Sequence, residues 1–215
     1  MSRQAALQSA PIKSDPTDTK QIILDLAAPL FSENGYDTVS MRVLAKEVGI
    51  TPAALYYHYP DKGALYNAVL QNIFTEKANE LSILLDRKAP PEIRLELLIA
   101  WLARLYCNDR VLTRLLHREL LDGDQAQIKL LTEDVFKGPL LAIEELMHLL
   151  APDRDARLSA ISVIALCLAH YELMPIFEHL PGKMKLDRDQ SIFISHVKTL
   201  VLSGLQGHDS SEGEE

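Results

Sequence analysis

The stretch SMRVLAKEVGITPAALYYH, residues 40–58, decides how the N-terminal part of the chain folds. Its first half predicts a short helix whose apolar face is formed by Val43, Leu44 and Val48. Gly49 can adopt the positive φ of a tight turn. Thr51 followed by Pro52 is the pattern of an N-cap and the first residue of a new helix. The spacing therefore predicts a helix-turn-helix.

The outer face of the second predicted helix favours a DNA partner. Ala53 and Ala54 are small, so this helix can approach a major groove closely. Tyr56, Tyr57 and His58 follow on its exposed side, and they offer hydrogen bonds to phosphates and base edges. Tyr59, in contrast, is predicted to pack inward as aromatic side chains often do.

Three further residues around this segment suit phosphate contact. Ser40 is placed to cap the first helix, Arg42 lies in its first turn, and Lys62 stands at the start of the following helix, where backbone N–H groups favour anions. Residues 18–66 contain four Lys or Arg and six Asp or Glu, so the segment is slightly acidic. We expect recognition to depend on a few placed groups and non-specific affinity to be modest. Arg3 and Lys13 could add contacts from the N-terminal arm.

Residues 20–66 resemble the N-terminal domain of the TetR family of transcriptional repressors. The matching stretches are ILDLAAPLFSENGY at 23–36, SMRVLAKEVG at 40–49 and TPAALYYHYPDKGAL at 51–65. Gly63 departs from the family, which often has an acidic residue there. The resemblance implies that phosphates are contacted by Ser40, Arg42, Thr51, Tyr57, His58 and Lys62. It implies that base edges lie near Pro52, Ala53, Ala54 and Tyr56.

The same resemblance implies a homodimeric repressor that binds double-stranded operator DNA and responds to a small-molecule effector. Repression rather than activation follows from the family's tendency alone. We expect a disordered arm over 1–16, the helix-turn-helix domain over 17–64, a helical effector-binding and dimerisation domain over 65–205, and a disordered acidic tail over 206–215. The last two predicted helices could form a four-helix dimer interface or an ordinary core.

The rest of the chain predicts an all-α fold. Helical periodicity runs through most of the 215 residues, 47% of which are hydrophobic, and no strand alternation is visible. After a turn at 122–124, one long helix is expected to reach Leu150 with a kink at Gly138-Pro139. The next helix is expected to begin at Pro152-Asp153 and run to about Phe177.

The composition argues against several classes of protein. A net charge of -8 disfavours a whole-surface nucleic-acid binder. Cys107 and Cys167 stand apart, without metal-ligand spacing, so we expect free thiols, no metal and no cofactor. No uninterrupted apolar run reaches membrane-spanning length and no secretory signal is visible, which predicts a cytoplasmic protein without a membrane partner.

An effector pocket is expected among the middle helices. Bulky or polar residues on largely apolar faces are its candidates, although each one alone is better explained as a core residue: Trp101, Tyr106, His117, Phe136, Met147, His170, Tyr171 and Met174. Together they suit a lipophilic or aromatic effector.

Two other functions fit the sequence less well than a regulator does. An all-α enzyme or small-molecule carrier would need convergent catalytic groups, and none has a recognisable spacing, so no catalytic residue is assigned. A helical adaptor would leave the Thr51–His58 face unexplained.

Overall fold

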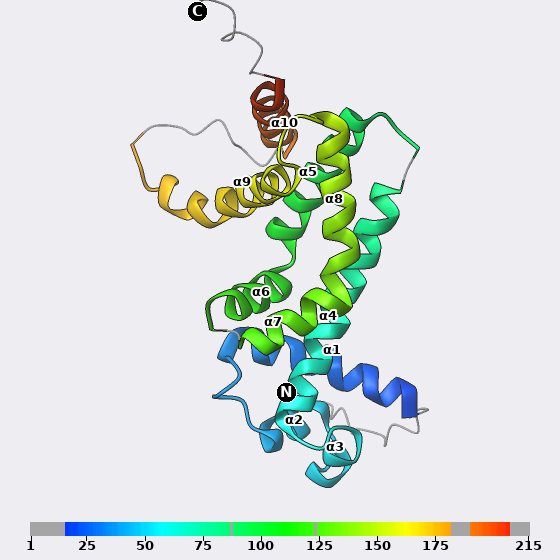
Figure 1. The fold of residues 1–215 in the computed structure, drawn as a ribbon. Helices are drawn as coiled ribbons and strands as arrows, with labels where there is room; N and C mark the ends of the chain where they lie inside the picture. Colours follow the sequence, from blue (N-terminus) through cyan, green and yellow to red (C-terminus); the bar gives the residue numbers. More distant parts are fainter. Residues whose placement is uncertain (1–15, 87, 123, 182–189, 207–215) are drawn as a thin grey trace, which may run out of the picture. The chain divides into compact units, whose positions relative to one another are not determined.

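The structure, a computed structural model, describes residues 16–86, 88–122, 124–181 and 190–206 (Figure 1). All regular elements in these ranges are helices, which confirms the all-α fold. The expected arm and acidic tail lie outside the described residues, apart from one residue of each range. The chain divides into two compact units, Met1–Val69 and Leu70–Glu215.

The first unit contains α1 (Pro16–Asn34), α2 (Met41–Val48), α3 (Pro52–His58) and the start of α4 (Lys62–Leu85). The second contains the remainder of α4, then α5 (Pro91–Asn108), α6 (Arg110–Asp122), α7 (Gln125–Leu131), η1 (Thr132–Phe136), α8 (Lys137–Leu150), α9 (Ala156–Phe177) and α10 (Gln190–Gln206).

The core of the first unit joins α1, α2, α3 and the start of α4. Its completely buried side chains include Ile23, Phe31, Leu44, Leu55 and Leu65. An aromatic cluster extends it: the ring centroid of Tyr66 lies 5.0 Å from that of Phe31 and 5.1 Å from that of Tyr36. Burial of these side chains stabilises the unit by the hydrophobic effect, at roughly 25 cal/mol per Å² of apolar surface.

The apolar face of α2 differs from the prediction at Val43. The buried residues of this helix are Met41, Leu44, Ala45 and Val48, at helical spacing. Val43 is 45% exposed, because it lies about 100° around the helix from Leu44. Counting Val43 as a core residue was therefore wrong.

In the second unit, α5 is the central helix of the core. It contacts α8, α9 and α10, and α9 also contacts α8 (Figure 1). Leu95, Leu98 and Ile99 of α5 are fully buried, together with Leu146 of α8 and Cys167 of α9. Leu95 of α5 and Phe193 of α10, 98 positions apart (193 − 95), thus share one core, which local sequence signals do not reveal.

The helix predicted to reach Leu150 with a kink at Gly138-Pro139 contains one turn of π-helix, η1, directly before α8 and that residue pair. Pro139 explains the position of this turn. A proline removes one helical N–H and its ring clashes with the carbonyl four residues earlier, which here belongs to Val135 within the π-turn. The wider turn relieves that clash in advance of the proline.

The helix α9 begins at Ala156 rather than at Pro152-Asp153, because Asp155 is its N-cap and accepts a hydrogen bond from the backbone N–H of Leu158 at 2.9 Å. It has 22 residues and a mean hydropathy of 1.7 over its most apolar window, of which 17% is buried. Among the described residues it is the one helix long and apolar enough to cross a bilayer. Interspersed Ser, Cys and His side chains hid this from a search for uninterrupted apolar runs.

Candidate nucleic-acid interface and ligand cavity

The turn between α2 and α3 is fixed by local hydrogen bonds. Ser40 Oγ accepts from the N–H of Val43 at 3.3 Å, and Thr51 Oγ1 accepts from the N–H of Ala54 at 3.1 Å. Gly49 adopts φ 78°, a left-handed conformation that disfavours a side chain. These features confirm the predicted caps and turn. The one buried side chain of α3, Leu55, packs this helix against the rest of the unit.

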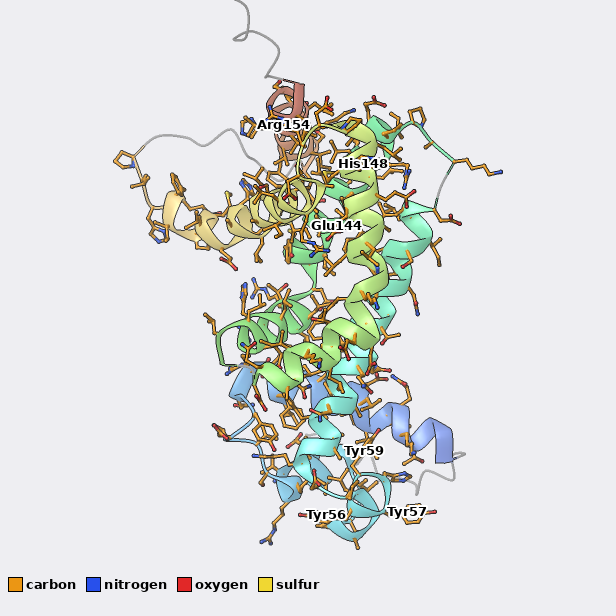
Figure 2. All side chains as sticks on the ribbon, viewed as in Figure 1. Tyr56, Tyr57, Tyr59, Glu144, His148 and Arg154 are labelled. Atoms are coloured by element: carbon orange, nitrogen blue, oxygen red, sulfur yellow. The ribbon has the colours of Figure 1, made fainter. Side chains whose placement is uncertain are left out.

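One face of α3 is left open to solvent. Tyr57 is 85% exposed and Tyr56 is 50% exposed, and Figure 2 shows both side chains directed away from the helix. Ala53 is exposed and His58 is half-buried beside Tyr57. The face thus offers one imidazole and two phenol groups next to a small alanine.

Tyr59 lies on the inner side of the same segment, as predicted. It is 8% exposed, and burial raises the pKa of its phenol. Its backbone N–H donates to the Leu55 carbonyl and ends α3. Tyr59 therefore packs in the core of the unit and leaves the open face to its two neighbours.

The remaining predicted DNA contacts lie around α3. Pro52 is exposed at its first turn, Ala54 is half-buried, and Arg42 is exposed on α2. Lys62 has partners within the unit: its Nζ donates to the carbonyls of Tyr36 at 2.7 Å and Asp37 at 3.4 Å, and it lies 4.2 Å from the Tyr36 ring centroid. Lys62 thus ties the start of α4 to the loop after α1.

A cavity of about 350 Å³ lies within the second unit. Its wall is largely apolar and includes Phe74, Leu81, Leu102, Leu116, Leu131, Phe136, Ile143 and Leu168. These residues come from α4, α5, α6, α7, η1, α8 and α9. A mostly apolar cavity of ~300 Å³ or more is the size and character of a small-molecule site.

A few polar groups interrupt this apolar wall. Lys77, Trp101, Tyr106, Glu119 and Thr132 line the cavity. Burial strongly raises the pKa of the Tyr106 phenol, which therefore stays neutral at physiological pH. Glu119 is a buried carboxyl on α6.

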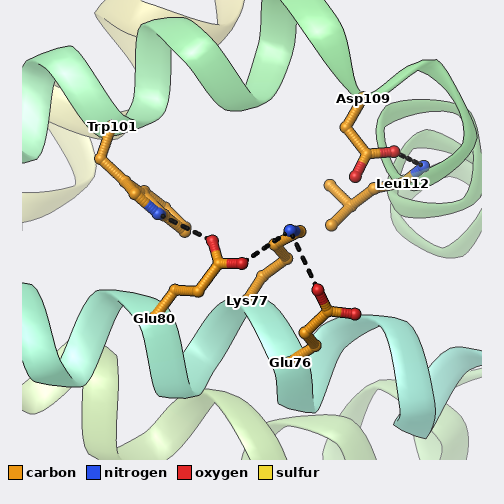
Figure 3. A network of polar contacts seen from close by, with 6 residues as sticks. All are labelled: Glu76, Lys77, Glu80, Trp101, Asp109 and Leu112. Carbon is orange, nitrogen blue, oxygen red and sulfur yellow. Dashed lines mark hydrogen bonds and ion pairs between the residues drawn. The ribbon is translucent and has the colours of Figure 1, made fainter.

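Two of these groups belong to a network that joins α4 and α5 (Figure 3). Lys77 Nζ lies 2.9 Å from Glu80 Oε1 and 3.4 Å from Glu76 Oε1, and Trp101 Nε1 donates to Glu80 Oε2 at 3.4 Å. The hydrogen bond to Glu80 raises the pKa of Lys77, and the same bond lowers the pKa of Glu80. Both side chains therefore stay charged at neutral pH.

The structure places the eight predicted pocket residues in several different environments. Trp101, Tyr106 and Phe136 line the cavity, whereas Met147 is completely buried in the core. His117 of α6 pairs with Glu172 of α9. The remaining three are half-buried on α9, outside the cavity wall: His170, Tyr171 and Met174.

The two aromatic residues of this α9 group pack on α10. The His170 ring stacks on Phe193 at 4.1 Å between centroids, and Tyr171 meets Phe193 edge-on at 5.5 Å. Burial lowers the pKa of His170 and raises that of Tyr171 to about 12, so both are neutral at physiological pH.

Lys77, Glu119 and Thr132 were missed by sequence reasoning. For Glu119 a signal existed, because it follows Leu112, Leu115 and Leu116 at helical spacing and so lies on the inward face of α6. Lys77 and Thr132 carry no such signal, since each belongs to the cavity only through the packing of distant helices.

Comparison with known proteins finds that the N-terminal part of the chain is similar to bacterial helix-turn-helix regulators. Residues 23–69 match the model of the bacterial regulatory proteins of the tetR family. The chain is 33% identical over 78 residues to the HTH-type transcriptional regulator AcrR of Shigella flexneri, covering 36% of each chain. It is 44% identical over 55 residues to IcaR of Staphylococcus epidermidis, a negative regulator of the biofilm operon icaADBC, covering 26% of this chain and 30% of IcaR. These matches span about a third of the relatives' length.

The fold agrees over nearly the whole chain. A TetR-like transcriptional regulator from Rhodococcus sp. RHA1 superimposes with a TM-score of 0.69 at 22% identity, covering 91% of this chain and all of that one. The regulator FadR from Bacillus subtilis, solved with stearoyl-CoA, superimposes with a TM-score of 0.69 at 18% identity, covering 86% and 98%. Residues 23–69 are thus similar in sequence to the tetR family of bacterial regulatory proteins, and the chain as a whole shares the fold of these regulators.

Proposed function

We propose that this protein is a DNA-binding transcriptional regulator, acting as a repressor that a small-molecule effector releases from its operator. The observation that carries the proposal is the open face of α3, where Tyr56 and Tyr57 are exposed on a helix whose start is fixed by the Thr51 cap. Large aromatic side chains exposed beside small alanines are unfavourable in isolation and are accounted for by a partner surface.

In this proposal α3 enters the major groove. Pro52, Ala53, Ala54 and Tyr56 lie at or near base edges, because small side chains allow close approach. Phosphates are contacted by a second set: Ser40, Arg42, Thr51, Tyr57, His58 and Lys62. Lys62 keeps its bonds to the loop after α1 and directs its remaining N–H toward the DNA.

The regulator acts as a homodimer. The α9 and α10 helices keep large apolar side chains exposed, including Leu158, Ile161 and Leu166 of α9 and Ile192 and Leu200 of α10. An apolar surface of this kind is typical of a subunit interface. A two-fold axis through it would present two α3 helices to half-sites about 34 Å apart or a multiple of that spacing.

The effector occupies the cavity of the second unit and is lipophilic or aromatic, since the wall is largely apolar. The stearoyl-CoA complex of the B. subtilis regulator shows that a protein of this fold accommodates a long acyl chain. The effector releases DNA only if it binds the DNA-free conformation more tightly than the DNA-bound one. The protein has no catalytic role in this proposal, and it acts in the cytoplasm, where bacterial DNA lies.

This proposal is tested by selecting binding sites from random double-stranded DNA, with the full-length chain at moderate salt. We expect enrichment of an inverted repeat whose half-sites are about one helical turn apart. An unenriched pool, with binding that falls uniformly with salt for all sequences, would contradict the proposal.

A further inference from the structure

Aromatic rings from three elements line the cavity of the second unit. They belong to Phe74 of α4, to Trp101 and Tyr106 of α5, and to Phe136 of η1. The rings of Phe74 and Phe136 pack together with 5.3 Å between their centroids. The face of an aromatic ring carries partial negative charge and attracts cations, most strongly where water is excluded. Several such rings around one apolar space favour a ligand that is both lipophilic and positively charged.

The cavity wall also contains a buried carboxyl group. Glu119 of α6 is 7% exposed and lines the cavity about one helical turn after Leu116, which lines it too. Glu119 already interacts within the chain, but a carboxylate has two oxygens and accepts several hydrogen bonds. A carboxylate in apolar surroundings is unfavourable unless a positive charge lies close to it. Glu119 can therefore pair with a cation that enters the cavity.

Among the described residues, Lys77 is the other charged group of the wall, and its charge is already offset. Its Nζ lies between the carboxylates of Glu76 and Glu80, at 3.4 and 2.9 Å respectively (Figure 3). Both carboxylates lie outside the cavity wall. Arg118 precedes Glu119 but also lies outside the wall, because adjacent helical positions point about 100° apart. The charged groups of the wall and the partners of Lys77 thus comprise one ammonium and three carboxyl groups.

The remaining polar groups of the described wall are neutral, and two of them already donate. Trp101 Nε1 donates to Glu80 Oε2, and Thr132 Oγ1 donates to the carbonyl of Ile128 at 2.8 Å. Burial raises the pKa of the Tyr106 phenol, which therefore carries no charge at neutral pH. An anionic ligand meets no uncommitted cation in this wall, whereas a cationic ligand meets Glu119 and the faces of the rings.

We propose that the effector is a compact lipophilic cation whose charge lies against Glu119 and the faces of the surrounding aromatic rings. This inference rests on the proposed effector role of the cavity. The class comprises quaternary ammonium and phosphonium ions and protonated amines that carry apolar or aromatic groups. A largely apolar cavity of about 350 Å³ has the size for such an ion, and burial of its substituents supplies hydrophobic stabilisation.

Two probes of the same shape and opposite charge test the sign of this preference. Tetraphenylphosphonium and tetraphenylborate both carry phenyl groups arranged tetrahedrally around a central atom, so they differ mainly in charge. The full-length protein is titrated with each probe while the fluorescence of Trp101, the single tryptophan of the chain, is followed. We expect saturable binding of tetraphenylphosphonium, about tenfold or more tighter than that of tetraphenylborate.

Two variants and one control locate the charge preference in the cavity. Glu119→Gln keeps the size of the side chain and removes its charge, so it should weaken tetraphenylphosphonium about tenfold without weakening tetraphenylborate. Phe136→Leu removes one ring face and should weaken tetraphenylphosphonium about threefold. Glu145→Gln makes the same change of charge at an exposed position of α8, outside the cavity wall, and should alter neither probe. Far-UV circular dichroism verifies that each variant is folded.

Tetraphenylborate bound as tightly as tetraphenylphosphonium, or more tightly, would overturn the inference. So would the absence of saturable binding of tetraphenylphosphonium, or an equal loss of both probes in folded Glu119→Gln. The preference of the unaltered protein decides the sign even if Glu119→Gln does not fold.

These titrations contain no DNA, so their outcome is independent of operator selection. A chain that selects DNA but does not prefer the cation contradicts this inference alone. A chain that binds the cation but selects no DNA contradicts the proposed function alone.

Discussion

The helix-turn-helix and the ligand cavity are built in opposite ways. The first is contained in residues 40–58, and each of its turns is set by a group within a few positions, such as the Ser40 and Thr51 caps and the positive φ of Gly49. The cavity draws its wall from positions 74 to 168 on seven elements. A site whose residues are neighbours in sequence can be predicted from the sequence, whereas a site that is assembled by the packing of distant helices cannot.

Truncation of one core leucine in each unit should cause the largest loss of stability and compares the two units directly. Leu55→Ala in the first unit and Leu98→Ala in the second each remove a fully buried side chain. Each should lower the free energy of unfolding by about 3 kcal/mol, because both lose transfer energy and leave a cavity. Urea denaturation followed by far-UV circular dichroism measures the loss. Exposed Leu121→Ala serves as the control, and a loss in the control equal to that of the core variants would contradict the burial pattern.

Replacement of two glycines by alanine should change the free energy of unfolding in opposite directions. Gly49→Ala should cost about 1 kcal/mol, because an L-residue is strained at φ 78° although its Cβ would meet nothing within 4 Å. Gly204→Ala in α10 also meets nothing and has no positive φ, so it should gain about 0.5–1 kcal/mol from helix propensity. Thermal unfolding of both variants should move in opposite directions. An unchanged or higher unfolding temperature of Gly49→Ala would show that the α2–α3 turn does not depend on the positive φ of residue 49.

Removal of an N-cap should cost a similar amount in each of the two units. Thr51→Ala removes the cap of α3 and Asp155→Ala that of α9, and each cap accepts one backbone hydrogen bond. Each loss should cost about 1 kcal/mol, since cap energies are local and do not depend on the unit. Urea midpoints of the two variants provide the test. Replacement of Thr51 by Ser should restore most of the loss, and no rescue would contradict the capping role.

Features that depend on local spacing could be predicted from the sequence, whereas the cavity wall, which depends on helix packing, could not. The all-α fold, the caps and the inward side chain of Tyr59 depend on local spacing and were predicted. Only Trp101, Tyr106 and Phe136 of the eight pocket candidates line the cavity. His170 also lies on a largely apolar helix, but the packing of α10 places its ring on Phe193 instead.

Alkylation of the exposed cysteine should have the smallest effect on the structure. Burial raises the pKa of the Cys167 thiol to about 12, whereas Cys107 is exposed on α5. A raised thiol pKa leaves very little reactive thiolate at pH 8, so iodoacetamide should modify Cys107 alone, without loss of helicity. Raising the pH to 9.5 increases the thiolate fraction of both groups, but burial should still protect Cys167. Peptide mass spectrometry measures the modification, and equal labelling of both at pH 8 would contradict the described core.

The open face of α3 is the central claim, and operator affinity of Tyr57→Ala with His58→Ala tests it most directly. Both side chains lie outside the core, so the variant should keep its helicity and unfolding midpoint. Its affinity for a selected operator, measured by gel shift, should fall about 100-fold or more, because each subunit loses two hydrogen bonds to DNA. The exposed pair Glu178→Ala with His179→Ala should bind normally. Unchanged affinity of the Tyr57 and His58 variant would contradict the assignment of α3 as the DNA-reading helix.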